Sequence, residues 1–390
     1  MRHFSPIGEL KKMSTTSNSK FNRNFLHFYF STLQDPRRTN KGNLRHCMSD
    51  ILLLTVSAVL CGCQEWDRIL MFGEHEIAWL KKHGSFANGL PSKDTMRRFF
   101  MALDPSSFQN CFSNWIDSLR NPNSLEVIAL DGKTVRGAKN LSAPQSITPH
   151  IVSAMATDQG LCLGQFKVTD KSNEISAIRE LLDVLFIENS IVTIDAMGCQ
   201  KTIVEQIRSK NANYIIAAKA NQGTLHLAIK DTLQLEKPIE IAEQDDCGHG
   251  RVEKRICKIY TNLSHLENSE KWKDLKSFIV VEKEVYHKSS QKTTNETRFY
   301  ISNLSNDATA INNAIRKHWS IENQLHWVLD VVFSEDDARK RIKNSAENFN
   351  IILKTALTLI NKETTLKKSK NNKRFKALIN KDYREKVLGF

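Results

Sequence analysis

The apolar positions in the first third of the chain recur at helical spacing. Apolar side chains fill residues 51–60 behind Ser49 or Asp50, either of which can cap a helix, and they recur every three or four positions in residues 66–81. Two more helices are predicted at residues 96–103 and 108–119. We therefore predict an all-helical module over residues 25–120, preceded by a polar, basic and flexible tail at residues 1–24.

The pattern changes to that of strands after a linker at residues 121–124. Stretches rich in β-branched residues predict five strands, at residues 126–130, 147–156, 161–169, 191–194 and 214–218. Two helices are predicted between the later strands, at residues 174–186 and 200–209. This order predicts an α/β domain with a mixed sheet.

A second group of strand-like runs interrupts this domain at about residues 221–303. The runs lie at residues 251–260, 277–286 and 297–301, and they predict a β-rich insertion. Helices are predicted to resume at residues 307–333 and 346–361, which ends the α/β domain that begins at residue 124. Residues 362–390 form a basic C-terminal segment that contains a final short helix.

Three acidic residues stand at the edges of apolar segments: Asp131, Asp195 and Glu322. A carboxylate at the end of a buried strand usually caps a helix, forms an ion pair or holds a metal ion, because leaving it unpaired is costly. Two such strands ending side by side would bring two carboxylates to one cation. Since Mg²⁺ binds carboxylate, water and phosphate oxygens, the pattern predicts a two-metal site for phosphoryl transfer.

Each of these acids also has a simpler interpretation. Asp131 precedes Gly132, a pair typical of hairpin turns, and Asp195 precedes a predicted helix that it could cap. Glu322 shares one edge of its predicted helix with three other polar residues, and the four could form a solvated ladder of ion pairs: His318, Glu322, His326 and Asp330. Asp330 is the alternative third metal ligand.

The charge of the chain favours an anionic partner. The formal net charge is +13 and the pI is about 9.3, a balance typical of proteins that neutralise DNA phosphates. The eight cysteines show neither disulfide nor zinc spacing. The longest apolar run, residues 51–63, is too short to cross a bilayer, and no secretion signal is evident, so we expect a cytoplasmic, nucleoid-associated protein and no membrane partner.

Three stretches resemble the signature blocks of bacterial insertion-sequence transposases with an Asp-Asp-Glu (DDE) site, of the H-repeat-associated type. They are residues 129–137, 193–198 and 316–336, and the resemblance extends from about Phe25 to the C-terminus. It implies an RNase H-like catalytic core with a β-rich insertion. It also implies that Asp131, Asp195 and Glu322 are catalytic and bind Mg²⁺ or Mn²⁺, with two ions in the site.

The resemblance further implies a DNA transposase that cuts the ends of its insertion sequence and joins them to target DNA. The partners would be double-stranded DNA and a second copy of the chain, because two ends must be held together, and the helical module is the candidate for binding those ends. Candidate DNA-contacting residues are Lys133, Arg136, Lys219, Arg316 and His318. The alternatives are an RNase H-like nuclease without strand transfer and a non-catalytic DNA-binding remnant of a decayed insertion sequence.

The third block departs from the wider superfamily around Glu322. Many relatives carry a Tyr, an Arg and a Lys at seven and four residues before the Glu and seven after it, whereas this chain has Ile315, His318 and Leu329 there. The phosphate contact that the Arg makes would then pass to His318 as a hydrogen-bond donor, or to Arg316 and Lys317. A protonated His318 would make cleavage fall as pH rises through neutrality.

Overall fold

The computed structural model describes residues 25–37, 44–121, 125–139, 148–168, 174–248 and 250–390. The predicted tail at residues 1–24 and most of the predicted linker at residues 121–124 therefore lie outside the described residues. The described chain divides into two compact units, one within Met1–Phe99 and Thr355–Phe390 and the other within Phe100–Lys354.

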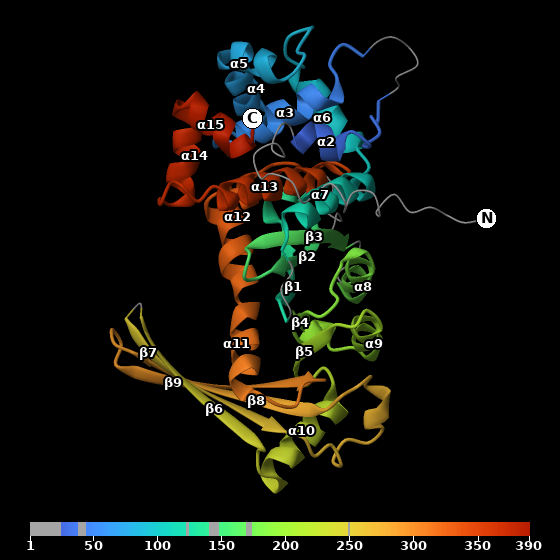
Figure 1. The fold of residues 1–390 in the computed structure, drawn as a ribbon, viewed down its shortest axis with the longest axis vertical. Coiled ribbons are helices and arrows are strands. Elements are labelled where there is room, and N and C mark those ends of the chain that lie inside the picture. The colour runs from blue at the N-terminus through green and yellow to red at the C-terminus, as the bar shows by residue number, and fades with distance from the viewer. Residues whose placement is uncertain (1–24, 38–43, 122–124, 140–147, 169–173, 249) are drawn as a thin grey trace, which may run out of the picture. The chain divides into compact units, whose positions relative to one another are not determined.

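The described part of the first unit is built from helices (Figure 1). They are α2 (Phe25–Phe30), α3 (Met48–Leu60), α4 (Trp66–His75), α5 (Ile77–His83), α14 (Lys370–Ile379) and α15 (Lys381–Leu388). The chain passes between the units within α6 (Lys93–Ala102) and α13 (Ser345–Lys362). Helix α3 is the central element, because its residues from Asp50 to Leu60 are all buried.

The start of α3 differs from the prediction. The helix begins at Met48 behind Cys47, so neither Ser49 nor Asp50 is its cap. The Asp50 carboxylate instead accepts the backbone N–H groups of Ser85, at 2.9 Å, and Phe86, at 2.7 Å. These two hydrogen bonds attach the first turn of α3 to the loop that follows α5.

The C-terminal helices complete the first unit. Arg374 of α14 donates to the carbonyl of Val59 at 3.0 Å, and Arg384 of α15 donates to the buried Glu76 carboxylate at 2.6 Å. Glu76 lies between α4 and α5, where one helix had been predicted over residues 66–81. The basic C-terminal segment is thus largely helical and packs through its arginines.

The second unit contains a nine-stranded sheet. Its strands are β1 (Val127–Thr134), β2 (His150–Ala156), β3 (Leu161–Val168), β4 (Ile191–Ile194), β5 (Asn213–Ala218), β6 (Glu240–Gly248), β7 (Arg251–Tyr260), β8 (Ser277–His287) and β9 (Lys292–Ser302). Their order across the sheet is β3-β2-β1-β4-β5-β9-β8-β7-β6. Strands β1, β2 and β3 are antiparallel neighbours, whereas β4 and β5 run parallel to β1.

The first five strands have the RNase H-like order. Helices α8 (Glu174–Val184) and α9 (Lys201–Ser209) cover one face of these strands, and α11 (Ala308–His318) covers the other (Figure 1). The predicted RNase H-like core is therefore confirmed, as is the helical chain that precedes it. Helix α7 (Pro105–Leu119) packs on β3 and belongs to the second compact unit. In the sequence it had been assigned to the helical module at residues 25–120.

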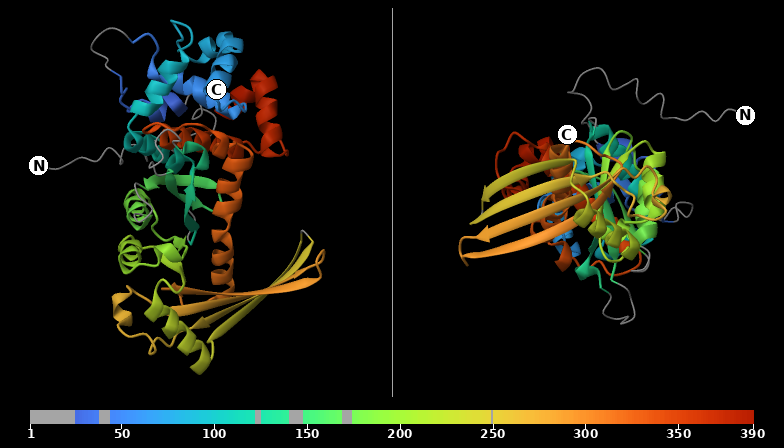
Figure 2. Two further views of the ribbon diagram at one scale, coloured as in Figure 1. Left: turned by 180° about the vertical axis from the view of Figure 1, so that it is seen from behind. Right: turned by 90° about the horizontal axis from the view of Figure 1, so that it is seen from below.

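Strands β6 to β9 form the β-rich insertion, and they continue the core sheet. Strand β9 pairs antiparallel with β5, with Ile216 opposite Ile301, and the four strands extend as a long twisted arm (Figure 2). Helix α10 (Gly223–Leu235) and strand β6 were not predicted. The sequence of β6 is acidic and its alternation of apolar residues is weak, so it carries little strand signal.

Helix α11 is held to the sheet by a hydrophobic core. Ile311 and Ile315 are buried against Val127 of β1, Ile191 of β4 and Ile215 of β5. Burying each of these side chains contributes about 1.5–3 kcal/mol. Because α11 lies across the parallel strands, the residues that follow it are carried to the ends of those strands.

The single helix predicted over residues 307–333 is interrupted. After α11 the chain forms a π-helical turn, Ile321–His326, and then the short helix α12 (Trp327–Val331). Single π-turns inside helices are uncommon and are frequent at functional sites. Glu322 lies in this turn.

Gly137 marks a close approach between two short 3₁₀ turns, η2 (Arg136–Ala138) and η7 (Glu335–Asp337). A Cβ at Gly137 would overlap the backbone carbonyl of Asp336. We expect Gly137→Ala to destabilise the second unit by about 1–3 kcal/mol, because the neighbour is backbone and cannot rotate away. Urea unfolding measures the loss. Gly223→Ala is the control, since among the described residues no heavy atom lies within 4 Å of a Cβ built there, and an equal loss in both variants would contradict the prediction.

Candidate active site

Asp131 and Asp195 occupy equivalent positions on neighbouring parallel strands. Leu130 of β1 is in register with Ile194 of β4, and the two aspartates are the residues that follow this pair. The negative charge of Asp195 is close enough to raise the pKa of Asp131. The sheet therefore brings two carboxylates to one region beside the end of β4.

Strand β1 does not end at Asp131. It continues to Thr134 and stays paired with β2, with Asp131 opposite Ser153 and Thr134 opposite His150. The hairpin turn considered for Asp131-Gly132 is therefore wrong, as is the strand end predicted at residue 130. Gly132 allows a close approach instead, because a Cβ there would overlap the side chains of Glu174 and His150.

The Asp195 carboxylate caps a short turn and not the helix predicted at residues 200–209, whose N-cap position is held by Gln200. Its Oδ1 accepts the N–H of Met197 at 3.0 Å, at the start of the 3₁₀ turn η4 (Ala196–Gly198). Burial raises the pKa of Asp195; the bond from Met197 opposes this effect and the charge of Glu174 adds to it. The cap engages Oδ1, which does not prevent Oδ2 from binding a cation.

The π-helical turn brings Glu322 to Asp131, with a histidine between them. Oxygen and nitrogen atoms of Asp131, Glu322 and His326 lie within 4.8 Å of one another, whereas Asp195 is outside this group. His326 Nδ1 is 3.2 Å from Glu322 Oε2 and 3.5 Å from Asp131 Oδ2. The imidazole is buried and the Glu322 side chain is 54% exposed, so the group opens to solvent on the glutamate side.

The charges of this group suit a divalent cation. Burial is the main cause that raises the pKa of Asp131 to about 6; the charge of His326 opposes the rise, and the charges of Asp195 and Glu322 contribute to it. A hydrogen bond from His326 lowers the pKa of Glu322. Asp131 thus carries a negative charge that its surroundings compensate poorly, and hard carboxylate oxygens are the ligands that Mg²⁺ and Mn²⁺ prefer. Residues Asp131 and Glu322 therefore fit the metal that the sequence predicts.

A second acidic group contains Asp330, Glu335 and Asp336, and a lysine of β1 pairs with two of these acids. Lys133 donates to the carboxylates of Asp330 and Glu335, and the backbone N–H of Arg136 donates to Asp336 at 3.0 Å. Burial opposes protonation of Lys133, but Glu335 and Asp330 raise its pKa overall. The position of Asp330 favours an ion pair for this residue. Lys133, a candidate phosphate contact, has its ammonium group occupied by these carboxylates.

The other candidate DNA contacts differ in their surroundings. Arg136 and Lys219 are exposed, and Lys219 lies near enough to Asp195 to lower its pKa. Arg316 pairs with Asp246 of the insertion sheet. Of these three cations, Lys219 is thus the one with a direct electrostatic effect on a proposed catalytic carboxylate.

His318 is held by the sheet. Its Nδ1 lies 3.1 Å from the hydroxyl of the buried Thr193 on β4. Burial lowers the pKa of His318 to about 4, so the imidazole is neutral near pH 7. The structure therefore favours a neutral positioning contact for His318 over the protonated phosphate ligand considered from the sequence.

The lowered pKa of His318 gives a signed stability prediction. The unfolded imidazole titrates near pH 6.5, so the unfolded state binds more protons between pH 6.5 and 4 and the folded state loses stability as pH falls through this range. We expect the wild type to lose up to about 2 kcal/mol more than His318→Asn between pH 7 and pH 5. Urea unfolding at both values measures this difference. Equal losses in the two proteins would contradict the prediction.

No helix within the described residues is long and apolar enough to span a bilayer. All eight cysteines are free thiols, and five of them are buried: Cys61, Cys111, Cys162, Cys199 and Cys257.

The fold and the carboxylate group together define an RNase H-like protein with an acidic site on its central strands. Residues 27–116 match the domain described as DDE_Tnp_1-associated, and residues 122–359 match the transposase DDE domain. The chain belongs to the DDE transposase family.

Several relatives are similar over most of their length. "Putative transposase YncI" from Escherichia coli O157:H7 is 39% identical over 92% of this chain and 93% of the relative. "H repeat-associated putative transposase YhhI" from Escherichia coli strain K12 is 37% identical over 92% of this chain and 96% of the relative. The predicted family, including its H-repeat-associated type, is thereby confirmed.

Two further comparisons are more limited. "Inactive transposase YbfQ" from Escherichia coli strain K12 is 49% identical over 53 residues, which are 14% of this chain and 63% of the relative. A chain of the piggyBac transposase synaptic complex with hairpin DNA aligns with a TM-score of 0.43 and 8% identity, over 93% of this chain and 77% of that one. The fold assignment rests on strand order and not on this distant likeness.

Proposed function

We propose that this protein is an active DNA transposase. It would cleave phosphodiester bonds at the ends of its own insertion sequence and join the freed 3′-hydroxyl groups to target DNA. The observation that supports this most directly is the meeting of Asp131 with Glu322, two carboxylates that are 191 positions apart in the sequence, in a chain of the DDE family. A core that brings distant acids together at a partly open position is suited to binding cations beside a phosphate.

The metal-binding residues we propose are Asp131, Asp195 and Glu322, with two Mg²⁺ or Mn²⁺ ions. When bound, such ions stabilise the charge of the attacking and leaving oxygens and lower the pKa of water. Asp131 supplies a carboxylate that must be deprotonated to bind a cation, and a pKa of about 6 leaves it largely ionised at neutral pH. His326 holds the Glu322 carboxylate through its Nδ1, which fixes the direction of an otherwise exposed side chain.

The DNA-binding roles belong to the proposal as well. We propose that the helical region at residues 25–120 recognises the ends of the insertion sequence and that two copies of the chain assemble on two ends. Arg136 and Lys219 are the proposed contacts to the scissile strand, because both side chains are exposed and Lys219 lies close enough to Asp195 to lower its pKa. Light scattering of the protein with end DNA would show two chains with two DNA ends if the assembly is as proposed.

Retention of all three acids favours an active enzyme over a decayed remnant. The deciding experiment incubates the purified protein with Mg²⁺ or Mn²⁺ and a plasmid that carries the DNA flanking its own gene. Nicks at the terminal repeats together with joined products support a transposase. Scattered nicks without joining would identify a nuclease, and a mobility shift without cleavage would identify a non-catalytic DNA-binding protein.

A further inference from the structure

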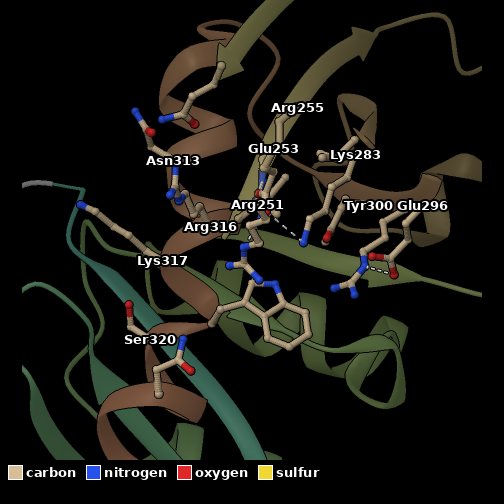
Figure 3. A pocket seen from close by; sticks show the side chains of 16 residues that line it. Arg251, Glu253, Arg255, Lys283, Glu296, Tyr300, Asn313, Arg316, Lys317 and Ser320 are labelled. Carbon is tan, nitrogen blue, oxygen red and sulfur yellow. Dashed lines mark hydrogen bonds and ion pairs between the residues drawn. The ribbon is translucent and has the colours of Figure 1, made fainter. Parts of the chain in front are cut away.

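A cavity of about 770 Å³ lies between the insertion sheet and helix α11 (Figure 3). Its walls come from strands β6 to β9 on one side and from α11 and the start of the π-helical turn on the other. Ser320 and Asn323, which line the cavity, flank Glu322 in the sequence. The cavity is therefore next to the proposed catalytic carboxylate but is built from different side chains.

The walls of the cavity are strongly cationic. Six basic side chains line it: Arg251, Arg255, Lys283, Arg298, Arg316 and Lys317. Only two carboxylates share the lining, Glu253 and Glu296. Glu253 is contacted by Arg255, Lys283 and, at 4.0 Å, Arg251, and Glu296 pairs with Arg298 at 2.7 Å. Two acids outside the lining, Asp246 and Asp158, pair with Arg316 and Lys317, so six cations face four carboxylates in all. The positive charge in the cavity exceeds the negative charge, which favours an anionic ligand.

An aromatic side chain lies among these cations. Trp319 lines the cavity and is 41% exposed, which is unusual for a tryptophan at the junction of a helix and a sheet. The Arg298 guanidinium lies 4.6 Å from the centre of the Trp319 ring, so the ring is held on one side by a cation. Asn313, Ser320 and Asn323 add neutral hydrogen-bonding groups to the same walls.

The size of the cavity decides which anion fits. A volume of about 770 Å³ falls in the range that accommodates small organic ligands, so it can hold a few nucleotides of one strand and cannot hold a double helix. Grooves for single strands combine cations that contact phosphates with an exposed aromatic ring that contacts a base. The described cavity contains both.

We propose that this cavity binds an unpaired DNA strand, with Arg251 and Lys283 contacting phosphates and Trp319 contacting a base. The inference rests on the proposed function, because an enzyme that cleaves strands generates and holds unpaired strand near the carboxylates. Binding would be independent of base sequence, since every base offers an aromatic face and the cations contact the backbone.

The test uses the full-length protein in EDTA and a fluorescein-labelled oligothymidylate of about 12 nucleotides. Fluorescence anisotropy gives its affinity. Trp319→Ala should weaken binding by roughly tenfold or more, and Trp319→Phe should restore most of the affinity. Arg251→Ala with Lys283→Ala should reduce the slope of log affinity against log salt by about 0.7 for each phosphate that the protein no longer neutralises. A blunt duplex of random sequence should bind equally well to wild type and Trp319→Ala.

Two matched controls separate the cavity from general surface effects. Lys254 lies on β7 between Arg251 and Arg255 but outside the cavity lining, so Lys254→Ala removes a similar charge from the same strand. Trp327 is 53% exposed and also lies outside the lining, so Trp327→Ala removes a similar ring. Equal reductions in affinity for the control and cavity variants would overturn the proposal, as would unchanged oligothymidylate binding by Trp319→Ala. Tighter binding of ATP than of the oligonucleotide would assign the cavity to a mononucleotide and overturn it too.

The plasmid assay keeps this inference distinct from the proposed function. If the wild-type protein cleaves and joins DNA but the cavity variants bind the oligonucleotide as tightly as the wild type does, the cavity inference is overturned and the proposed function stands. Strand binding that depends on Trp319, in a protein that never cleaves its own flanking DNA, would overturn the proposed function and leave the cavity assignment standing.

Discussion

Replacing Asp131 with asparagine should reduce metal-dependent strand cleavage by on the order of a thousandfold while leaving DNA binding nearly intact. The amide has the size of the carboxylate but lacks its charge, and the Asp131 carboxylate interacts with Asp195 as well as with the Glu322–His326 pair. Asp195→Asn and Glu322→Gln should have comparable effects. Nicking of a plasmid carrying the terminal repeats measures cleavage, and a mobility shift measures binding.

Two other acids serve as comparisons for this series. Asp158 is exposed and pairs with Lys317, so Asp158→Asn should leave cleavage unchanged. Asp330→Asn tests the alternative third ligand. If Asp330→Asn is inactive while Glu322→Gln cleaves normally, Asp330 takes the place of Glu322. Full cleavage by Asp131→Asn in Mg²⁺ would remove Asp131 from the site.

Replacing Arg384 with alanine should cost about 3–5 kcal/mol of stability in the first unit. The Arg384 side chain is fully buried, donates to Glu76 at 2.6 Å, and lies 4.3 Å from the Trp79 ring and 5.3 Å from the Phe72 ring. Its removal leaves a buried carboxylate without its closest cation. Thermal and urea unfolding should both show the loss of stability.

Lys381 provides a matched control for Arg384 because its ammonium contacts the same carboxylate. Lys381 lies 3.4 Å from Glu76 but is 57% exposed, so Lys381→Ala should cost about 1 kcal/mol or less. Adding Glu76→Gln to Arg384→Ala should recover part of the stability, since the buried charge is then gone. Losses of equal size for Arg384→Ala and Lys381→Ala would show that burial of the pair contributes little.

Much of the fold follows from patterns that are local in the sequence. Strand β7 occupies residues 251–260 and β4 occupies residues 191–194, both as predicted, because apolar and β-branched residues cluster there between turn residues. Strand β6 was missed because Glu240–Gly248 is acidic and is held in the sheet by its pairing with β7. The C-terminal arginines gave no signal of burial, since their partners are more than 300 positions away.

The sequence predicts which acidic residues belong to the candidate site, but it does not predict which side chains contact them. Asp131, Asp195 and Glu322 follow from their places at the edges of apolar runs and from the resemblance to the DDE family. For His326 the sequence indicates only that it neighbours Glu322, because a helical pattern cannot show that the imidazole also lies 3.5 Å from Asp131. Lys133 looked like a phosphate contact because its partners, Asp330 and Glu335, are about 200 positions away.

The π-helical turn at Ile321–His326 sets an angular offset between the helices on either side of it. An α-helix advances about 100° per residue, and a π-turn accommodates one extra residue in a single turn. Before the turn, the helical rotation of α11 directs His318 toward Thr193. After the turn, the rotation of the following helix directs Asp330 toward Lys133. Deleting one residue from the turn would rotate one of these side chains away from its partner.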